Sequence, residues 1–301
     1  MGQLPSARVN RISDCRKALT VKVYLCIFVC FSTKAVHLEL ASDLSTSEFL
    51  DVLQRFISRR GCPAHLYSDC GTNFVGASTA LTRALQSLQA ELQFSKLIND
   101  FCFSKSISFH FNPPSAPHQG GLWERAVQSA KYHLNRLIAN YIPTYKVLNT
   151  LVIRIEGILN SRPLSTISSD PNDFSALTPA HFLLGRSLIE PPDADAAIQR
   201  CSPRQLHWIQ TVIKDFWTRW KSEYLPALAP RGKWTSTSPN LSVGDLVLID
   251  ADNTPPSCWP LARVLQVFPG SDGIVRRARL KTATSELTRP AVKLFRLPIY
   301  D

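Results

Sequence analysis

The sequence lacks paired cysteines and long apolar runs. None of the eight cysteines stands in a Cys-x-x-Cys pair, and no histidine pair at ligand spacing accompanies them, so a structural zinc site is not predicted. The longest apolar run, residues 23–31, is shorter than the roughly 20 residues of a membrane-spanning helix. The first residues have neither the basic start nor the apolar core of a signal peptide. We expect an intracellular protein with reduced cysteines and no membrane partner.

Acidic residues are the scarcer charge. The 301-residue chain has 23 Asp and Glu against 34 Lys and Arg, a formal net charge of +11. Residues 200–301 carry 15 basic and 8 acidic groups, residues 1–60 carry 9 and 5, and residues 61–199 carry 10 of each. Because a basic surface attracts phosphate, we expect the two ends to bind nucleic acid and the neutral middle to hold any chemistry.

Residues 22–40 predict two strands joined by a turn at residues 32–34. The first strand is apolar throughout, as in a strand buried on both faces, and the second alternates, with His37 and Glu39 on its polar side. The pattern therefore favours the start of a sheet.

Helical and strand patterns then follow in mixed order. Ser45 and Glu48 form the two ends of a capping box, which predicts a helix that ends at Gly61. The further patterns are a short strand at 64–68, a helix around 77–92, a strand at 107–111, and helices at 122–141 and 146–160. This mixture predicts a mixed-sheet α/β domain.

The C-terminal third changes character after a Pro- and Asp-bearing linker at 185–200. Residues 203–224 predict a helix with an aromatic stripe that includes Trp217 and Trp220. Short strands follow at 241–249, 262–268, 275–280 and 293–297, with turns at 270–273 and around 284–285, and predict a small barrel. The tryptophans could bind a partner, but we favour packing against the barrel.

Two carboxylates stand where a site could form. Asp69 ends the strand at 64–68, and Glu124 opens the helix at 122–141 after a Pro- and Gly-rich loop. Sites in α/β sheets gather beyond the strand ends. Glu124 shares a helix face with Gln128 and Lys131, a surface that could meet a metal ion and phosphate. From spacing alone, a solvated helix face is the simpler interpretation.

The residues around Asp69 and Glu124 form two longer sequence motifs. Residues 67–76 (YSDCGTNFVG) and 112–125 (NPPSAPHQGGLWER) closely resemble the catalytic core of retroviral-type integrases, and more narrowly the BEL/Pao group of animal LTR retrotransposons. Further matches lie at residues 34–40, 160–164, 177–185, 243–247 and 286–290. The resemblance covers nearly all of residues 20–298 in a consistent order.

The resemblance implies a ribonuclease H-like mixed-sheet core followed by a small SH3-like all-β barrel. The expected division is a remnant or linker at 1–20, the catalytic core at 21–184, a linker and amphipathic helix at 185–230, and the C-terminal domain at 231–301. The implied partners are double-stranded DNA, as element ends and target, and further copies of the chain. The implied location is the nucleus, after synthesis in the cytoplasm.

The resemblance also implies a polynucleotidyl transferase that performs 3′-end processing and strand transfer. Two Mg²⁺ (or Mn²⁺) ions are held in such enzymes by an Asp, Asp, Glu triad. Asp69 corresponds to the second member and Glu124 to the third. The DNA-binding residues expected on this basis are Asn73, His118, Gln128 and Lys131 in the core, and Arg276, Arg277 and Arg279 in the barrel.

The sequence departs from the family at its beginning. The first Asp of the triad should lie in a strand before Lys22, but residues 2–20 show no alternating strand with a central Asp. Asp14 is the single acidic residue there and lies in a polar segment, so we do not expect it to be the triad member. The first strand and the preceding zinc-binding domain are expected to be missing. Because positioning dominates phosphoryl transfer, we expect an inactive or nearly inactive protein.

Two other functions remain open from the sequence. One is a non-catalytic nucleic-acid-binding remnant or domesticated protein, which the basic C-terminal third favours. The other is a cysteine hydrolase that uses Cys70, which stands where the family usually has Asn, together with His118. That pair lacks an identifiable orienting partner.

Overall fold

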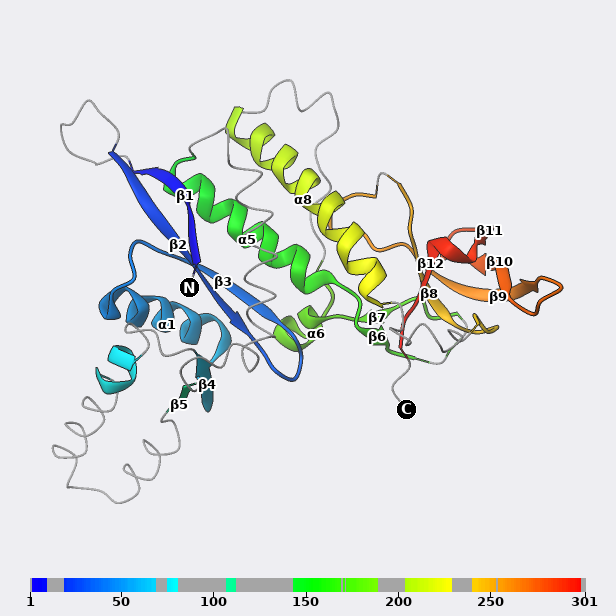
Figure 1. Ribbon diagram of the computed structural model, residues 1–301, viewed down its shortest axis with the longest axis horizontal. Coiled ribbons are helices and arrows are strands. Elements are labelled where there is room, and N and C mark those ends of the chain that lie inside the picture. The colour runs from blue at the N-terminus through cyan, green and yellow to red at the C-terminus, as the bar shows by residue number, and fades with distance from the viewer. Residues whose placement is uncertain are drawn as a thin grey trace, which may run out of the picture. The chain divides into compact units, whose positions relative to one another are not determined.

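The computed structural model describes residues 2–9, 19–68, 75–80, 107–111, 143–168, 170, 172–188, 204–228, 240–252 and 254–298 (Figure 1). These residues form a mixed α/β protein. The chain divides into two compact units. Unit 1 comprises Met1–Val29 and His37–Ile153, and unit 2 comprises Cys30–Val36 and Arg154–Asp301. No helix in the described ranges is long and apolar enough to cross a membrane.

Unit 1 begins with an antiparallel meander. Strand β1 (Gly2–Val9) pairs with β2 (Leu19–Val29), and β3 (Val36–Ala41) extends the sheet in the order β1-β2-β3. Helix α1 (Thr46–Arg60) packs on this sheet (Figure 1). The core between them consists of Cys26, Ala41, Phe49, Val52, Leu53 and Ala77, all buried.

Strand β1 lies within residues 1–20, which the sequence pattern left as a remnant or linker, and it contains no acidic residue. Its pairing with β2 runs from Gly2 opposite Leu25 to Val9 opposite Leu19, with an irregularity between Leu4 and Ala7. Pro5 lies in that irregular stretch. Proline has no N–H for a ladder, and strands accommodate it at edges and bulges. Backbone pairing therefore forms a strand here, although the side chains show no alternation.

The start of α1 also differs in detail from the predicted capping box. The Ser45 hydroxyl accepts the Glu48 N–H at 3.1 Å, as predicted. The Glu48 carboxylate, however, accepts from the Ser42 hydroxyl at 2.8 Å, and the Ser45 N–H donates to Asp43 at 2.7 Å. Asp43 thus accepts the Ser45 N–H, a bond that the capping box assigns to Glu48. At the other end Gly61 caps the helix with φ +89°, as predicted.

Two further strands of unit 1 run parallel. Strand β4 (His65–Ser68) pairs with β5 (Ser108–Phe111), so that His65 lies opposite Ser108 and Tyr67 opposite His110. Leu66, Ile107 and Phe109 pack against the core beneath α1. The two predicted strands are therefore present as neighbours.

Unit 2 holds the C-terminal half of α5 (Tyr145–Ser161), followed by three short elements. These are β6 (Ser165–Thr166), β7 (Ala176–Leu177) and α6 (Pro179–Leu184). At the end of α5, Asn160 is 1% exposed and bonds both backbone groups of Val36, accepting from the N–H at 2.8 Å and donating to the carbonyl at 2.7 Å. The Arg162 guanidinium donates to the Lys34 carbonyl. Side chains at the end of α5 and just after it thereby hold the turn of residues 30–36.

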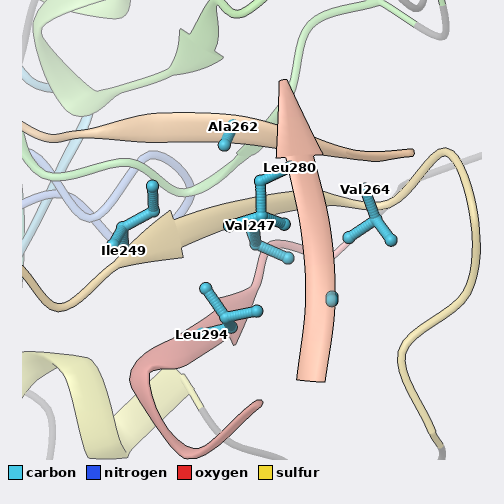
Figure 2. Packing of buried hydrophobic residues seen from close by; sticks show 7 residues of the cluster. Val247, Ile249, Ala262, Val264, Leu280 and Leu294 are labelled. Atoms are coloured by element: carbon cyan, nitrogen blue, oxygen red, sulfur yellow. The ribbon is translucent and has the colours of Figure 1, made fainter. Parts of the chain in front are cut away.

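A five-stranded antiparallel sheet forms the rest of unit 2, in the order β11-β10-β9-β8-β12. The strands are β8 (Leu246–Ile249), β9 (Leu261–Pro269), β10 (Val275–Lys281), β11 (Glu286–Pro290) and β12 (Leu294–Arg296), with a 3₁₀ turn η2 (Ala291–Lys293) before the last. Figure 2 shows its core, in which Val247, Ile249, Ala262, Val264, Leu280 and Leu294 converge from four strands.

The sequence pattern missed β11. Four of its five residues are exposed, and the fifth, Leu287, packs against the core. An edge strand with one inward apolar residue has no detectable alternation. Its pairing with β10, from Arg277 opposite Pro290 to Lys281 opposite Glu286, decides its conformation instead.

Helix α8 (Arg204–Leu228) packs on this sheet through its aromatic stripe. Trp217 and Trp220 are buried, and their rings lie 4.7 and 5.8 Å from the ring of Trp259, which precedes β9. Farther along, Leu225 joins the core formed with Leu246 of β8. The preferred interpretation of the stripe as core is confirmed, and exposed tryptophans for a partner are not found in this helix.

Candidate functional site

The predicted catalytic residues lie outside the described part of the chain. This applies to Asp69 and Glu124, to the predicted DNA contacts Asn73, His118, Gln128 and Lys131, and to Asp14 and Cys70. The structure does describe the strand that leads to Asp69, because β4 ends at Ser68. Its parallel neighbour β5 ends at Phe111, so both strands have their carboxyl ends at one edge, where sites form in α/β sheets.

Carboxylates are scarce in the meander of unit 1. In the residues of β1, β2 and β3, all of which the structure describes, Glu39 is the single acidic residue. It was predicted to lie on the polar side of an alternating strand, but every residue of β3 is buried. The polar side is buried because arginines of α1 cover it.

The Glu39 carboxylate is held by three cationic or hydrogen-bonding side chains. Its side chain is 5% exposed, and its oxygens lie 3.1 Å from Arg55 Nε, 2.9 Å from Arg59 Nη1 and 3.2 Å from His37 Nε2. Arg60 Nε donates to His37 Nδ1 at 3.3 Å, which leaves Nε2 of His37 to carry the proton toward Glu39.

These contacts decide the charge of Glu39. Burial raises the pKa of this carboxyl, but the hydrogen bond from His37 and the charges of Arg59 and Arg55 outweigh it, so that the pKa lies below its ordinary value. A carboxylate neutralised in this way is a structural ion pair. Its oxygens are engaged by these side chains and are not free for a hard cation such as Mg²⁺.

In unit 2, the three predicted DNA-binding arginines of β10 have different surroundings. Arg276 makes a two-bonded ion pair with Asp272 across the 270–273 turn, at 2.8 and 2.6 Å. Hydrogen bonding from Arg276 lowers the pKa of Asp272 to about 2, and the same contact raises the pKa of Arg276. This arginine stabilises the hairpin.

The other two arginines lie on one face of the strand. Arg279 pairs with Glu286 of β11 at 2.7 Å. Arg277 lies over the Phe268 ring, 5.7 Å from its centroid, and has no acidic partner among the described residues. Because the ring leaves the edge groups of the guanidinium open, Arg277 is the arginine of the three best placed to meet a phosphate.

Sequence reasoning missed one residue of this face and one exposed arginine of the neighbouring strand. Phe268 is the neighbour of Arg277 across the β9–β10 pair, and Arg289 of β11 is an exposed arginine whose described contact is the backbone carbonyl of Thr288. Arg289 pairs with the inward-facing Ala278, so it lies on the sheet face opposite to that of Arg277. The register of the strands decides both placements, and the sequence pattern did not predict it.

Among the described residues, the cysteines and the other potential metal ligands do not gather into a metal site of three or more ligands. Burial raises the pKa of the Cys26 thiol to about 12, as expected for the core residue predicted there. Within the described ranges, no group of three or more His, Cys, Asp or Glu side chains gathers as a metal site.

Comparison with known proteins gives matches to a family model and to solved structures. Residues 204–297 match a family described as "Family of unknown function (DUF5641)". The chain is also similar to a chain of the cryo-EM structure of the simian T-cell lymphotropic virus intasome in complex with PP2A regulatory subunit B56 gamma. The identity is 15%, the alignment covers 98% of this chain and 80% of that one, and the TM-score is 0.36. No curated protein matches. The first match spans less than half of the chain and the second has a low TM-score, so neither assigns an activity.

Proposed function

We propose that this chain is an integrase-type DNA-binding protein of the BEL/Pao retrotransposon kind, with impaired polynucleotidyl transfer. It acts on double-stranded DNA in the nucleus as a homo-oligomer. The motifs at residues 67–76 and 112–125 support the family. The meander β1-β2-β3 supports a ribonuclease H-like core, and the strand order of the five-stranded sheet, with a 3₁₀ turn before its last strand, supports an SH3-like barrel.

The observation that carries DNA binding is the exposed Arg277 of β10, with Arg289 of the neighbouring edge strand β11 on the other face of the sheet. Arg277 and Arg289 are exposed, and neither has a carboxylate partner among the described residues. Arginines at such positions neutralise phosphates and release the counterions that surround DNA. The net charge of +7 on residues 200–301 extends the same field over the unit.

The proposed impairment rests on the carboxylates of the meander. A triad of two Asp and one Glu needs an oxygen ligand from a strand of this sheet, and Glu39 is neutralised by Arg55 and Arg59. Asp69 and Glu124 together supply at most two of the three ligands. The chain's remaining role is then to bind and position DNA, which is also what a non-catalytic or domesticated descendant does.

DNA binding is tested on the full chain with a fluorescent 30-base-pair duplex. We expect Arg277→Ala to weaken binding and to reduce the slope of log affinity against log salt by about 0.9, because one phosphate contact is lost. Arg276→Ala is the matched control from the same strand, and we expect a smaller change because Asp272 already neutralises Arg276. Equal salt slopes for wild type and Arg277→Ala would refute the assigned face.

Catalysis is tested separately, by strand transfer with Mg²⁺ and with Mn²⁺. We expect no joining of DNA ends above the level of an Asp69→Asn, Glu124→Gln double variant. Robust joining by the wild-type chain alone would overturn the proposed impairment and leave the DNA-binding face untouched.

A further inference from the structure

Two exposed histidines of unit 1 lie side by side on neighbouring strands. His65 of β4 and His110 of β5 bring Nδ1 and Nε2 to 3.1 Å from each other. The parallel register places His110 opposite Tyr67, so His65 is its diagonal neighbour on the same face. Diagonal neighbours across strands remain within reach of aromatic side chains.

We propose that His65 Nδ1 and His110 Nε2 form a two-ligand site for a divalent transition-metal ion such as Zn²⁺ or Cu²⁺. Imidazole nitrogens bind these ions at about 2.0–2.1 Å, so two nitrogens on one ion lie about 2.9 Å apart in square-planar and about 3.3 Å apart in tetrahedral geometry. The observed 3.1 Å falls between these separations. The site is independent of the carboxylate chemistry discussed above.

The rings are also oriented for this role before any ion binds. Tyr67 stacks on His110, with ring centroids 4.5 Å apart and planes at 15°, which restricts the rotation of that imidazole. The two imidazole rings lie 5.2 Å apart at 48°. Fixing ligand side chains in advance lowers the ordering cost of binding.

Two neutral imidazole rings can bind the ion without releasing a proton. One of the two facing nitrogens must carry a hydrogen to make the present contact, and the other accepts it. When that hydrogen moves to the far nitrogen of its own ring, both facing lone pairs point at the ion. Two protein ligands leave the other positions of the ion to water, because the described residues offer no third ligand of the same kind nearby.

The test uses the full chain and Cu²⁺–iminodiacetate, a chelate that leaves room for two cis imidazoles. Electron spin-echo modulation counts the bound imidazoles, and titration gives the affinity. We expect two imidazoles for wild type and an at least about tenfold loss of affinity in His65→Gln and in His110→Gln. His207→Gln, an exposed histidine of α8, is the matched control and should keep both. Excess Mg²⁺ should not compete, because Mg²⁺ prefers oxygen ligands.

Three results would overturn the site: one imidazole or none in the wild-type spectrum, two imidazoles retained in His65→Gln, or equal affinity in wild type and both strand variants. Circular dichroism of each variant confirms that the fold persists, which the exposure of both histidines leads us to expect.

Discussion

The amide of Asn160 should contribute more to stability than any other single side-chain amide described in unit 2. It accepts the Val36 N–H at 2.8 Å and donates to the Val36 carbonyl at 2.7 Å, and its side chain is almost fully buried. Asn160→Ala leaves one buried donor and one buried acceptor of Val36 without their partners. Each such group costs about 1–3 kcal/mol. Allowing for partial relaxation, we expect a loss of about 2–4 kcal/mol in the free energy of unfolding.

The chain contains a matched control for this prediction. Asn240 makes the same pair of bonds, donating to the Gly273 carbonyl at 2.8 Å and accepting the Val275 N–H at 3.1 Å, but it is exposed. Water replaces its bonds when the side chain is removed, so we expect Asn240→Ala to cost about 0.5–1 kcal/mol. The measurement is urea unfolding followed by tryptophan fluorescence, which reports on Trp217 and Trp220. If Asn160→Ala costs no more than Asn240→Ala, burial is not what decides the worth of this contact.

Two further predictions concern titratable groups. The pKa of Glu39 is lower in the folded protein than in the unfolded chain, so its stabilisation is present above the unfolded value and is lost as pH falls through the folded value. Glu39→Gln should therefore cost about 2 kcal/mol near pH 7. In urea titrations the gap from wild type should close as the pH falls below the ordinary range of a glutamate carboxyl and through the lowered folded value; a constant gap contradicts the ion pair. The second prediction concerns the thiols: iodoacetamide at pH 8 should leave the buried Cys26 unmodified and label the exposed Cys30 and Cys62. Cys30 should react first, because hydrogen bonds around Thr33 outweigh the partial burial of Cys30 and lower the pKa of its thiol. Mass spectrometry of native and urea-unfolded protein checks this, and labelling of native Cys26 as fast as Cys62 would count against its burial.

Local patterns predicted the elements whose side chains carry their own signal. The cap at Ser45 and the C-cap at Gly61 bound α1 because both act through neighbouring backbone groups. The stripe of α8 was readable for the same reason, since its aromatic residues recur at the helical period.

Elements decided by pairing with a distant strand could not be read in this way. The strands β1 and β11 have little apolar alternation, and backbone bonding to β2 and β10 forms them. Buried charge was equally hidden: Arg263 of β9 is 5% exposed and donates to the carbonyls of Gly244, Ser168 and Asp173. An arginine in a strand pattern gives no sign that three backbone oxygens lie within its reach.

The predicted site residues were placed by motif and not by geometry, so their arrangement stays a prediction. For the arginines of β10, the sequence identified the residues but not their partners. Asp272 and Glu286 engage two of them, and only the three-dimensional register separates Arg277 from its neighbours.

The turn of residues 30–36 has a practical consequence for dissecting the protein. It belongs to unit 2, although the strands on both sides of it belong to unit 1. A fragment cut at Arg154 would leave the Asn160 amide and one bond of the Arg162 guanidinium without their acceptors on Val36 and Lys34. Such a fragment should express poorly or aggregate. Adding the turn back as a tethered peptide, or permuting the chain so that both segments are contiguous, gives the second unit its complete set of residues.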